Sequence, residues 1–163
     1  MDLGIAGRTA LVCASSKGLG KGCAKALAEA GCRVIINGRD AARLEQTRAE
    51  LLKQGGDIVA VAADVGTAEG RAALLRAAGN VDILVNNNAG PPFRDFRAVD
   101  HDAMLAGLEA NMIAPLELTK AVIDPMAERD FGRIVNITSS SVKAPIAGLD
   151  LSSVARAALT AFL

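Results

Sequence analysis

The sequence predicts an α/β fold, a doubly wound parallel sheet with helices on both faces. Short apolar stretches typical of buried strands alternate with helix-like stretches along all 163 residues, and this alternation indicates right-handed crossovers between parallel strands. Hydrophobic residues make up 51% of the chain and aromatic residues only 2%, so Ala, Val, Leu and Ile must form the core, as in helices packed on a parallel sheet. We expect one domain over residues 1–163.

The first strand leads into the most informative turn of the sequence. Thr9–Cys13 is an apolar strand, and residues 14–20 after it read Ala-Ser-Ser-Lys-Gly-Leu-Gly. A helix then runs to Gly31, and its inward face consists of Leu19, Cys23, Leu27 and Ala30. A glycine-bearing turn that opens a helix can hold an anionic group, because the first N–H groups of the helix are unpaired and lie at the positive end of its dipole. An ordinary tight turn is the alternative.

Two further strand–helix units follow. Residues 33–37 form the strand of the first, and its helix over residues 41–53 has an inward face made of Leu44, Leu51 and Leu52. Residues 58–62 form the strand of the second, and Thr67 caps its helix, which runs to Ala78.

The last third of the chain contains two strands and two helices. Val81–Val85 is the fourth strand, and Asp100 or Asp102 caps a long helix toward Arg129. Residues 133–138 form the fifth strand. A final helical pattern begins at Ser152 and reaches Leu163 without a glycine or a polar cap, so we expect the chain to be the N-terminal part of a longer one.

The loop over residues 90–99 is the longest irregular segment. It follows the fourth strand, so it should lie over the carboxyl edge of the sheet, where ligands bind in such folds.

The chain resembles the short-chain dehydrogenase/reductase family over essentially its whole length. Cys13–Gly20 is similar to the TGxxxGxG turn of the family, with Cys13 and Ala14 in place of Thr and the first Gly. The other matching positions are Asp64 in Ala-Asp-Val, the NNAG-like segment 86–90, Asn111, and residues 132–139, Gly-Arg-Ile-Val-Asn-Ile-Thr-Ser. Because segment 86–90 has one Asn too many, the Asn pair of the family corresponds to either 86–87 or 87–88. The resemblance implies a Rossmann-type, dinucleotide-binding sheet.

The resemblance also implies a set of cofactor-binding residues. They are Ala14, Ser16, Lys17, Gly18, Leu19, Gly20, Arg39, Asp64, Val65, Asn87, Ala89 and Gly90. NAD-selective sites place an acidic residue after the second strand, whereas this chain has Asn37-Gly38-Arg39 there. Because Arg39 and Lys17 can pair with a 2′-phosphate, we expect NADP(H) as the cofactor. Asp40 follows, but we expect it to cap the next helix rather than to enter the site. The alternative is that Arg39 and Lys17 are both solvated surface charges.

The catalytic residues implied by the resemblance are incomplete. Ser139 matches the Ser that polarises the substrate carbonyl, and Asn111 matches the Asn of a water-linked proton relay. Ser152 and Arg156 stand where the family has its Tyr and Lys, and the chain contains no Tyr. An aliphatic hydroxyl is a poorer acid than a phenol and Arg keeps its proton, so the usual proton transfer is compromised.

Two other features concern the same chemistry. Lys143 and a buried Asp150 are conceivable substitutes for the missing acid, although loop charges are the simpler interpretation. Pro115 lacks the N–H that would bond the Asn111 carbonyl, so we expect a kink there.

Composition excludes several other functions. Lys plus Arg equals Asp plus Glu, at 18 each, so nothing indicates a nucleic-acid partner. The three cysteines form no CxxC pair and His101 is the only histidine, so we expect no metal site and reduced thiols. Without a signal peptide or a long apolar run, we expect a cytoplasmic protein with no membrane partner.

The sequence thus favours an NADP(H)-dependent oxidoreductase. It would transfer a hydride between nicotinamide and a small carbonyl or alcohol substrate, and the resemblance implies a homodimer or homotetramer. The alternative is a catalytically impaired NADP(H)-binding protein that acts as a regulator or partner. A methyltransferase is disfavoured by the missing acid after the second strand.

Overall fold

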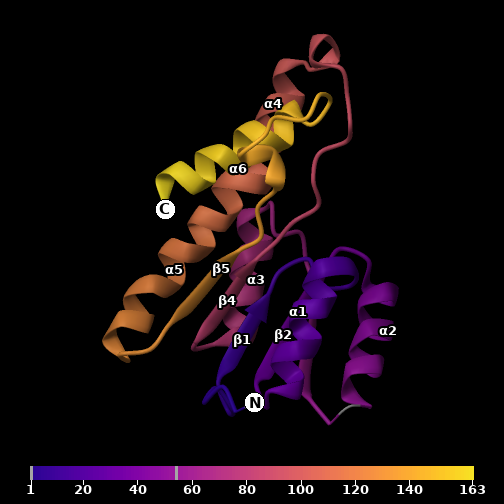
Figure 1. Ribbon diagram of the computed structural model, residues 1–163. Helices are drawn as coiled ribbons and strands as arrows, with labels where there is room; N and C mark the ends of the chain where they lie inside the picture. Colours follow the sequence, from indigo (N-terminus) through magenta and orange to yellow (C-terminus); the bar gives the residue numbers. More distant parts are fainter. Residues whose placement is uncertain (1, 54) are drawn as a thin grey trace.

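Five parallel strands form one sheet in the order β3-β2-β1-β4-β5 in the computed structural model (Figure 1). The structure describes residues 2–53 and 55–163; Met1 and Gln54, which fall within the predicted domain, lie outside the described residues. The strands are β1 (Thr9–Val12), β2 (Arg33–Gly38), β3 (Asp57–Ala62), β4 (Ile83–Asn86) and β5 (Arg133–Asn136). The predicted doubly wound sheet is therefore confirmed.

Helices cover both faces of this sheet and its carboxyl edge. They are α1 (Gly18–Glu29), α2 (Ala41–Leu52), α3 (Ala68–Ala78), α4 (His101–Leu108), α5 (Ala114–Glu128) and α6 (Asp150–Phe162). A π-helical turn, Glu109–Ile113, joins α4 to α5, and short 3₁₀ turns lie at Phe96–Ala98 and Ser140–Val142. In Figure 1, α4 and α6 lie beyond the carboxyl ends of the strands.

Alternating side chains of the strands build two apolar cores. Ala10 and Val12 of β1 pack with α1 and α2 on one face, where Ala24 and Leu44 are buried. Leu11 faces the other way, into a cluster with α3 and α5. Because successive strand residues point to opposite faces, a strand buried on both sides must be apolar at every position, which is why these strands could be recognised from the sequence.

The strand order places a crevice at the carboxyl end of β1. This strand pairs with β2 on one side, Val12 beside Ile36, and with β4 on the other, Val12 beside Val85. The first three strands extend the sheet from β1 toward one edge, and β4 and β5 are then added on the opposite side of β1. The connections after β1 and β4 therefore leave toward opposite faces of the sheet. Open α/β sheets bind ligands at such a reversal.

Two leucines were wrongly predicted to face inward. Leu19 is 70% exposed and Leu52 is 39% exposed. Leu19 lies in the first turn of α1, and the small residues Gly20 and Ala24 make the close contact with the sheet instead. Leu52 ends α2, about 100° around the helix axis from the buried Leu51.

Two strand ends differ from the prediction by two residues, and four others differ by one. β4 begins at Ile83 rather than Val81 because Asp82 is used in side-chain contacts: its carboxylate accepts a hydrogen bond from the Thr9 N–H at 2.9 Å. β5 ends at Asn136 rather than at Thr138 because the carbonyls of Ile137 and Thr138 accept hydrogen bonds from Arg156.

The long helix predicted over residues 100–129 is interrupted by the π-helical turn. Asp100, not Asp102, caps α4 by accepting a hydrogen bond from the Ala103 N–H at 2.8 Å. The Ala114 N–H reaches the Glu109 carbonyl, five residues back. Pro115 follows at once and cannot donate to Asn111, so the widened turn is the local form of the expected kink.

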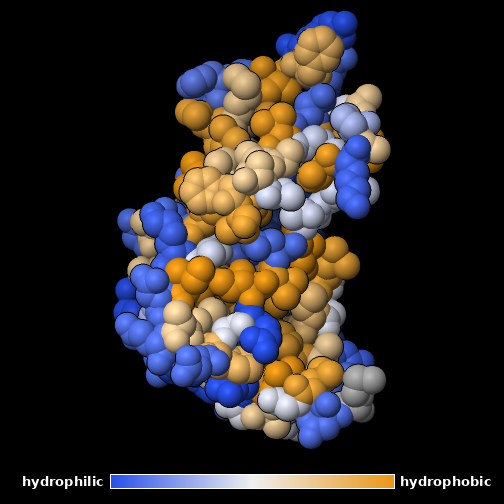
Figure 2. All heavy atoms as spheres, turned by 60° about the vertical axis from the view of Figure 1, so that its left-hand side comes forward, coloured by the Kyte–Doolittle hydropathy of each residue, from blue (hydrophilic) through white to orange (hydrophobic). Residues whose placement is uncertain are grey.

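The sheet is open beyond β5 in the described part of the chain, where β5 pairs with β4 only. Figure 2 brings the side of α5 and β5 forward and shows apolar side chains exposed over this face. Half-exposed residues of these elements are Ile123 and Val135. Edge strands of this kind have a free row of backbone donors and acceptors.

Candidate cofactor and substrate cleft

The β1–α1 turn presents backbone N–H groups to the crevice. Ala14 has a φ of 45° and Gly18 a φ of 57°, both in the left-handed region. Lys17 occupies the N-cap position of α1 but makes no side-chain capping bond, whereas α2, α3 and α4 are capped by Asp40, Thr67 and Asp100. The start of α1 therefore offers its N–H groups and its dipole to an anion.

Gly20 is required where α1 passes over this turn. A Cβ at Gly20 would lie 2.4 Å from the Ala14 carbonyl oxygen and 3.0 Å from the Asn87 amide nitrogen. That amide donates to the same carbonyl at 3.3 Å. The turn, the helix and the end of β4 thus meet at one carbonyl group, which leaves no room for a side chain.

Asn37 holds this edge of the sheet together and was missed as a site residue. It is buried at the end of β2, and its amide donates to the carbonyls of Val61 and Ala63 while its oxygen accepts from the Ala14 N–H at 3.2 Å. The Ser15 hydroxyl closes the network by accepting from the Asn37 N–H at 2.8 Å. A polar residue ending an apolar strand was the available signal.

Arg39 and Lys17 are the cations beside the crevice. Arg39 follows β2 directly, and its guanidinium lies 3.7 Å from the Asp64 carboxylate at the end of β3. Asp40 caps α2, with its carboxylate accepting from the Arg43 N–H at 3.0 Å. The interpretation of Asp40 as a helix cap is confirmed, and it keeps this acid out of the crevice.

A cavity of about 280 Å³ lies over the turn. Ten of the predicted cofactor-binding residues line it: Ala14, Ser16, Lys17, Gly18, Leu19, Arg39, Asp64, Val65, Asn87 and Ala89. Gly20 lies beneath the turn, and Gly90 lines the adjoining cavity. The exposed position of Leu19 follows from its place on this rim.

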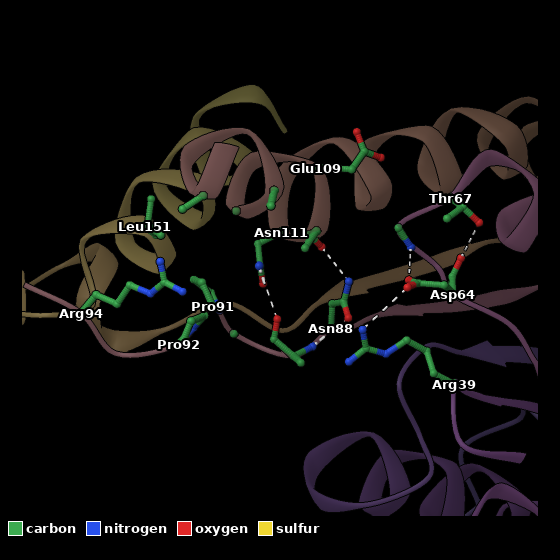
Figure 3. A pocket seen from close by; sticks show the side chains of 17 residues that line it. Arg39, Asp64, Thr67, Asn88, Pro91, Pro92, Arg94, Glu109, Asn111 and Leu151 are labelled. Atoms are coloured by element: carbon green, nitrogen blue, oxygen red, sulfur yellow. Dashed lines mark hydrogen bonds and ion pairs between the residues drawn. The ribbon is translucent and has the colours of Figure 1, made fainter. Parts of the chain in front are cut away.

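A second cavity of about 450 Å³ continues from the first, because Arg39, Asp64, Asn88 and Ala89 line both. It lies between the loop after β4, the π-helical turn and Leu151 of α6 (Figure 3). The Asn111 amide points to the Ala89 carbonyl at 3.5 Å, and Asn88 donates to the Ala110 carbonyl at 3.1 Å. These bonds tie the loop to the π-helical turn.

The three consecutive asparagines have separate surroundings. Asn86 is buried and donates to the side chain of Asn136 on β5 at 2.9 Å. Asn87 reaches the turn after β1, and Asn88 reaches the π-helical turn. Each therefore fixes a different neighbour of β4, and Asn87 belongs to the pair in both registers that the sequence left open.

Ser139 lies just after β5 with its hydroxyl oriented by Ser141. Its oxygen accepts from the Ser141 N–H at 3.1 Å and from the Ser141 hydroxyl at 2.9 Å. The Ser141 backbone N–H thus fixes the Ser139 oxygen, and the two hydroxyl groups lie within hydrogen-bond distance of each other.

Ser152 and Arg156 lie together on α6 and are turned inward. They are 6% and 8% exposed, and the guanidinium donates to the Ser152 hydroxyl at 3.2 Å and to the carbonyls of Ile137 and Thr138. Burial lowers the pKa of Arg156. Neither residue lines the larger cavity; Arg156 and Asn111 share a narrow crevice of about 10 Å³ behind it.

The other candidates are less buried. Lys143 and Asp150 are exposed, so Asp150 lacks the burial on which its role as an acid depended. His101 is exposed at the start of α4. Burial raises the pKa of the Cys13 thiol to about 12. Within residues 2–53 and 55–163 no three potential ligands gather as a metal site would require, and no helix is long and apolar enough to span a membrane.

The architecture and the glycine turn match a known family. The family model described as short chain dehydrogenase matches residues 8–163. The chain belongs to this family. An uncharacterized oxidoreductase of Bacillus subtilis, YvaG, is 37% identical over 147 residues, which cover 89% of this chain and 56% of that protein. Human dehydrogenase/reductase SDR family member 4 is 33% identical over 160 residues, covering 95% and 58%.

Solved structures of the family are similar to this chain over nearly its whole length. L-sorbose reductase from Gluconobacter frateurii, complexed with NADPH and L-sorbose, has a TM-score of 0.93 at 29% identity, over 99% of this chain and 64% of that one. A 7α-hydroxysteroid dehydrogenase complexed with NADH has a TM-score of 0.91 at 25% identity, over 98% and 64%. The chain spans less than two thirds of these relatives, and the fold accepts both cofactors.

Proposed function

We propose that the chain is the cofactor-binding part of an NADP(H)-dependent oxidoreductase that acts on a carbonyl or alcohol substrate. The observation that carries the proposal is the pair of cations, Lys17 and Arg39, on the cavity over the β1–α1 turn. No acidic residue ends β2, where Gly38 is followed by Arg39. A carboxylate at this place would repel a 2′-phosphate, and a guanidinium would bind it through paired hydrogen bonds.

The residues fit a dinucleotide. The uncapped start of α1 provides N–H groups for the pyrophosphate, and Gly20 allows the helix to approach the turn. Arg39 can exchange Asp64 for the 2′-phosphate, since the two lie at 3.7 Å on an exposed edge. The adenosine end of the cofactor then lies beside Asp64 and Val65. The passage to the larger cavity is lined by Asn87, Ala89 and Gly90. Bound nicotinamide supplies or accepts the hydride.

Ser139 is the residue we propose to polarise the substrate carbonyl. Its oxygen accepts a hydrogen bond from the Ser141 backbone N–H, which holds the hydroxyl group in place after β5. Asn111, at the inner end of the larger cavity, holds a water or the substrate. The proton route is atypical: Ser152 is a weak acid, and Arg156 acts as a fixed positive charge that holds Ser152 and the end of β5.

One observation favours the alternative of a cofactor-binding protein without turnover. Ser152 and Arg156 are buried and bonded to each other and to the backbone. A panel of aldehydes and ketones with NADPH separates the two. Oxidation of NADPH above the rate without protein supports the enzyme; tight NADPH binding with no oxidation on any substrate supports the binding protein.

Replacement of Arg39 tests the cofactor assignment. Arg39→Ala should weaken NADPH binding about tenfold, because a charge-assisted pair contributes about 1.5 kcal/mol, and should leave NADH binding unchanged. Fluorescence titration of both cofactors measures this. Arg76→Ala, an exposed arginine of α3 outside both cavities, is the matched control. Equal NADPH affinity in Arg39→Ala and Arg76→Ala would contradict the NADP(H) preference.

We also propose assembly as a homodimer or homotetramer in the cytoplasm. Apolar side chains exposed on α5 and α6, among them Ile123, Val154 and Phe162, support the assembly. Light scattering of the purified protein measures it, and a monomer at micromolar concentration would contradict it.

A further inference from the structure

The larger cavity has one charged side chain that the described residues leave without a partner. Two carboxylates line it, and both are paired: Asp64 with Arg39 at 3.7 Å and Glu109 with Arg71 at 3.0 Å. Arg94 also lines the cavity; the residue is exposed, and its guanidinium makes no hydrogen bond or ion pair within residues 2–53 and 55–163. The end of the cavity at Arg94 is therefore electropositive.

Arg94 lies at the opposite end of the cavity from Arg39. Figure 3 shows the two guanidinium groups on either side of Asn88 and Asn111, with Arg94 beside Pro91 and below Leu151. Arg39 is thus placed at the adenosine side and Arg94 at the side reached past Asn111. A cation in this place serves a ligand other than the cofactor phosphates.

The backbone at Arg94 is anchored, so the guanidinium is carried by a fixed part of the loop. The Arg94 N–H donates to the Gly148 carbonyl at 3.1 Å. The Phe93 ring lies directly on Gly148, where a Cβ would come within 2.3 Å of the ring. Asp95 does not compete for Arg94, because it caps the following 3₁₀ turn and lies 3.4 Å from Arg97.

The remaining lining of this end is apolar and small. Pro91, Pro92 and Leu151 form it together with the small residues Ala103, Ala106 and Gly107 of α4. This surface suits a short hydrocarbon body, and an unpaired guanidinium in such surroundings binds carboxylate or phosphate oxygens in a forked geometry.

We infer that the substrate carries an anionic oxygen group, carboxylate or phosphate, which Arg94 binds while the carbonyl lies toward Asn111. The inference rests on the proposed oxidoreductase function and adds the substrate class to it. Arg94 is in this assignment the specificity-determining residue of the larger cavity. It takes no part in proton or hydride transfer.

Calorimetry with acetoacetate tests the inference without need of cofactor or turnover. Acetoacetate should bind the chain, its methyl ester should bind about tenfold more weakly, and Arg94→Gln should remove the difference. Acetol phosphate, compared with acetol, repeats the measurement for a phosphate. Arg97→Gln, on the same loop but outside the cavity, should behave as wild type.

Each result decides one of the two proposals. Loss of anion preference in Arg94→Gln but not in Arg97→Gln supports the inference. Absence of binding by both anions, or an anion preference unchanged in Arg94→Gln, overturns it. NADPH binding and oxidation are measured separately: if NADPH does not bind, the proposed function fails while calorimetry still decides the role of Arg94.

Discussion

The β1–α1 turn and the segment from Ser139 to Arg156 depart from their family in different ways. In the turn, Ala14 replaces a glycine, yet the conformation is retained with a φ of 45° and the cavity is still formed. In the later segment, Ser152 and Arg156 stand at the positions that the resemblance assigns to Tyr and Lys, and this pair is directed inward. Binding by backbone N–H groups tolerates side-chain change, whereas proton transfer depends on one acidic group.

The largest effect is expected from a substitution that disrupts the β1–α1 turn. Gly20→Ala places a methyl group 2.4 Å from the Ala14 carbonyl oxygen. We expect a loss of about 3 kcal/mol in the free energy of unfolding and NADPH binding weakened about 100-fold, measured by urea denaturation and fluorescence titration.

Gly22→Ala is its control, because a Cβ there meets nothing within 4 Å. It should stabilise α1 by about 1 kcal/mol. If the two variants had equal stability, the close approach at Gly20 would not matter.

The second prediction tests the proposal that the later segment lacks a general acid. Ser152→Tyr combined with Arg156→Lys should raise the rate of NADPH oxidation about 100-fold, because a positioned general acid contributes at least this much. The rate is measured by following the absorbance of NADPH at a single wavelength with a panel of ketones. Ser153→Tyr with Arg156→Lys puts the phenol one position along α6, where Ser153 bonds the Leu149 carbonyl, and should give no gain. Equal rates in both double variants would show that position 152 does not face the substrate.

Arg156→Met tests whether the inward pair is structural. It leaves the carbonyls of Ile137 and Thr138 without their donor, which should lower the free energy of unfolding by about 2 kcal/mol. Denaturation in urea measures this, with Arg76→Met on the surface of α3 as control. A loss no greater than in the control would mean that solvent replaces the guanidinium.

The smallest effect sharpens the comparison at the turn. Ala14→Gly removes the strain of a side chain at a φ of 45°. Glycine also raises the conformational entropy of the unfolded state, which offsets part of this gain, so we expect a net stabilisation of about 0.5 kcal/mol. Ala24→Gly, in the buried interior of α1, should destabilise instead. Matched denaturation curves check the opposite signs; the same sign in both would argue against strain at Ala14.

Local rules explain what could be predicted from the sequence. Strands buried on both faces are apolar throughout, which located β1 to β5, and side chains such as Asp40 and Thr67 cap helices within their own sequence. The glycine turn was assigned to the cleft because it opens a helix, Arg39 because no acid follows β2, and Asp64 through the resemblance to the family. Their places on one cavity follow from the parallel order of the strands.

Contacts distant in the sequence explain what was missed. Asn37 bridges residues from two other strand ends, and Arg156 donates to the carbonyl of Ile137, which follows β5 and lies 19 residues earlier in the chain. Pro115 signalled a lost hydrogen bond, but the sequence did not indicate the bond that Asn88 donates to the Ala110 carbonyl in the π-helical turn. Arg94 lies in a loop without periodicity, so only the fold could place it in the cavity.

The contact of the Phe93 ring with Gly148 joins the loop after β4 to the segment before α6, and it constrains how these two loops can vary in related sequences. The ring occupies the space of any side chain at position 148, and the Arg94 N–H bonds the same glycine. An insertion in either loop would disturb this hydrogen bond and the ring contact, so a change in one loop acts on the position of the other. Remodelling the substrate end of the cleft should therefore treat the two loops as a unit.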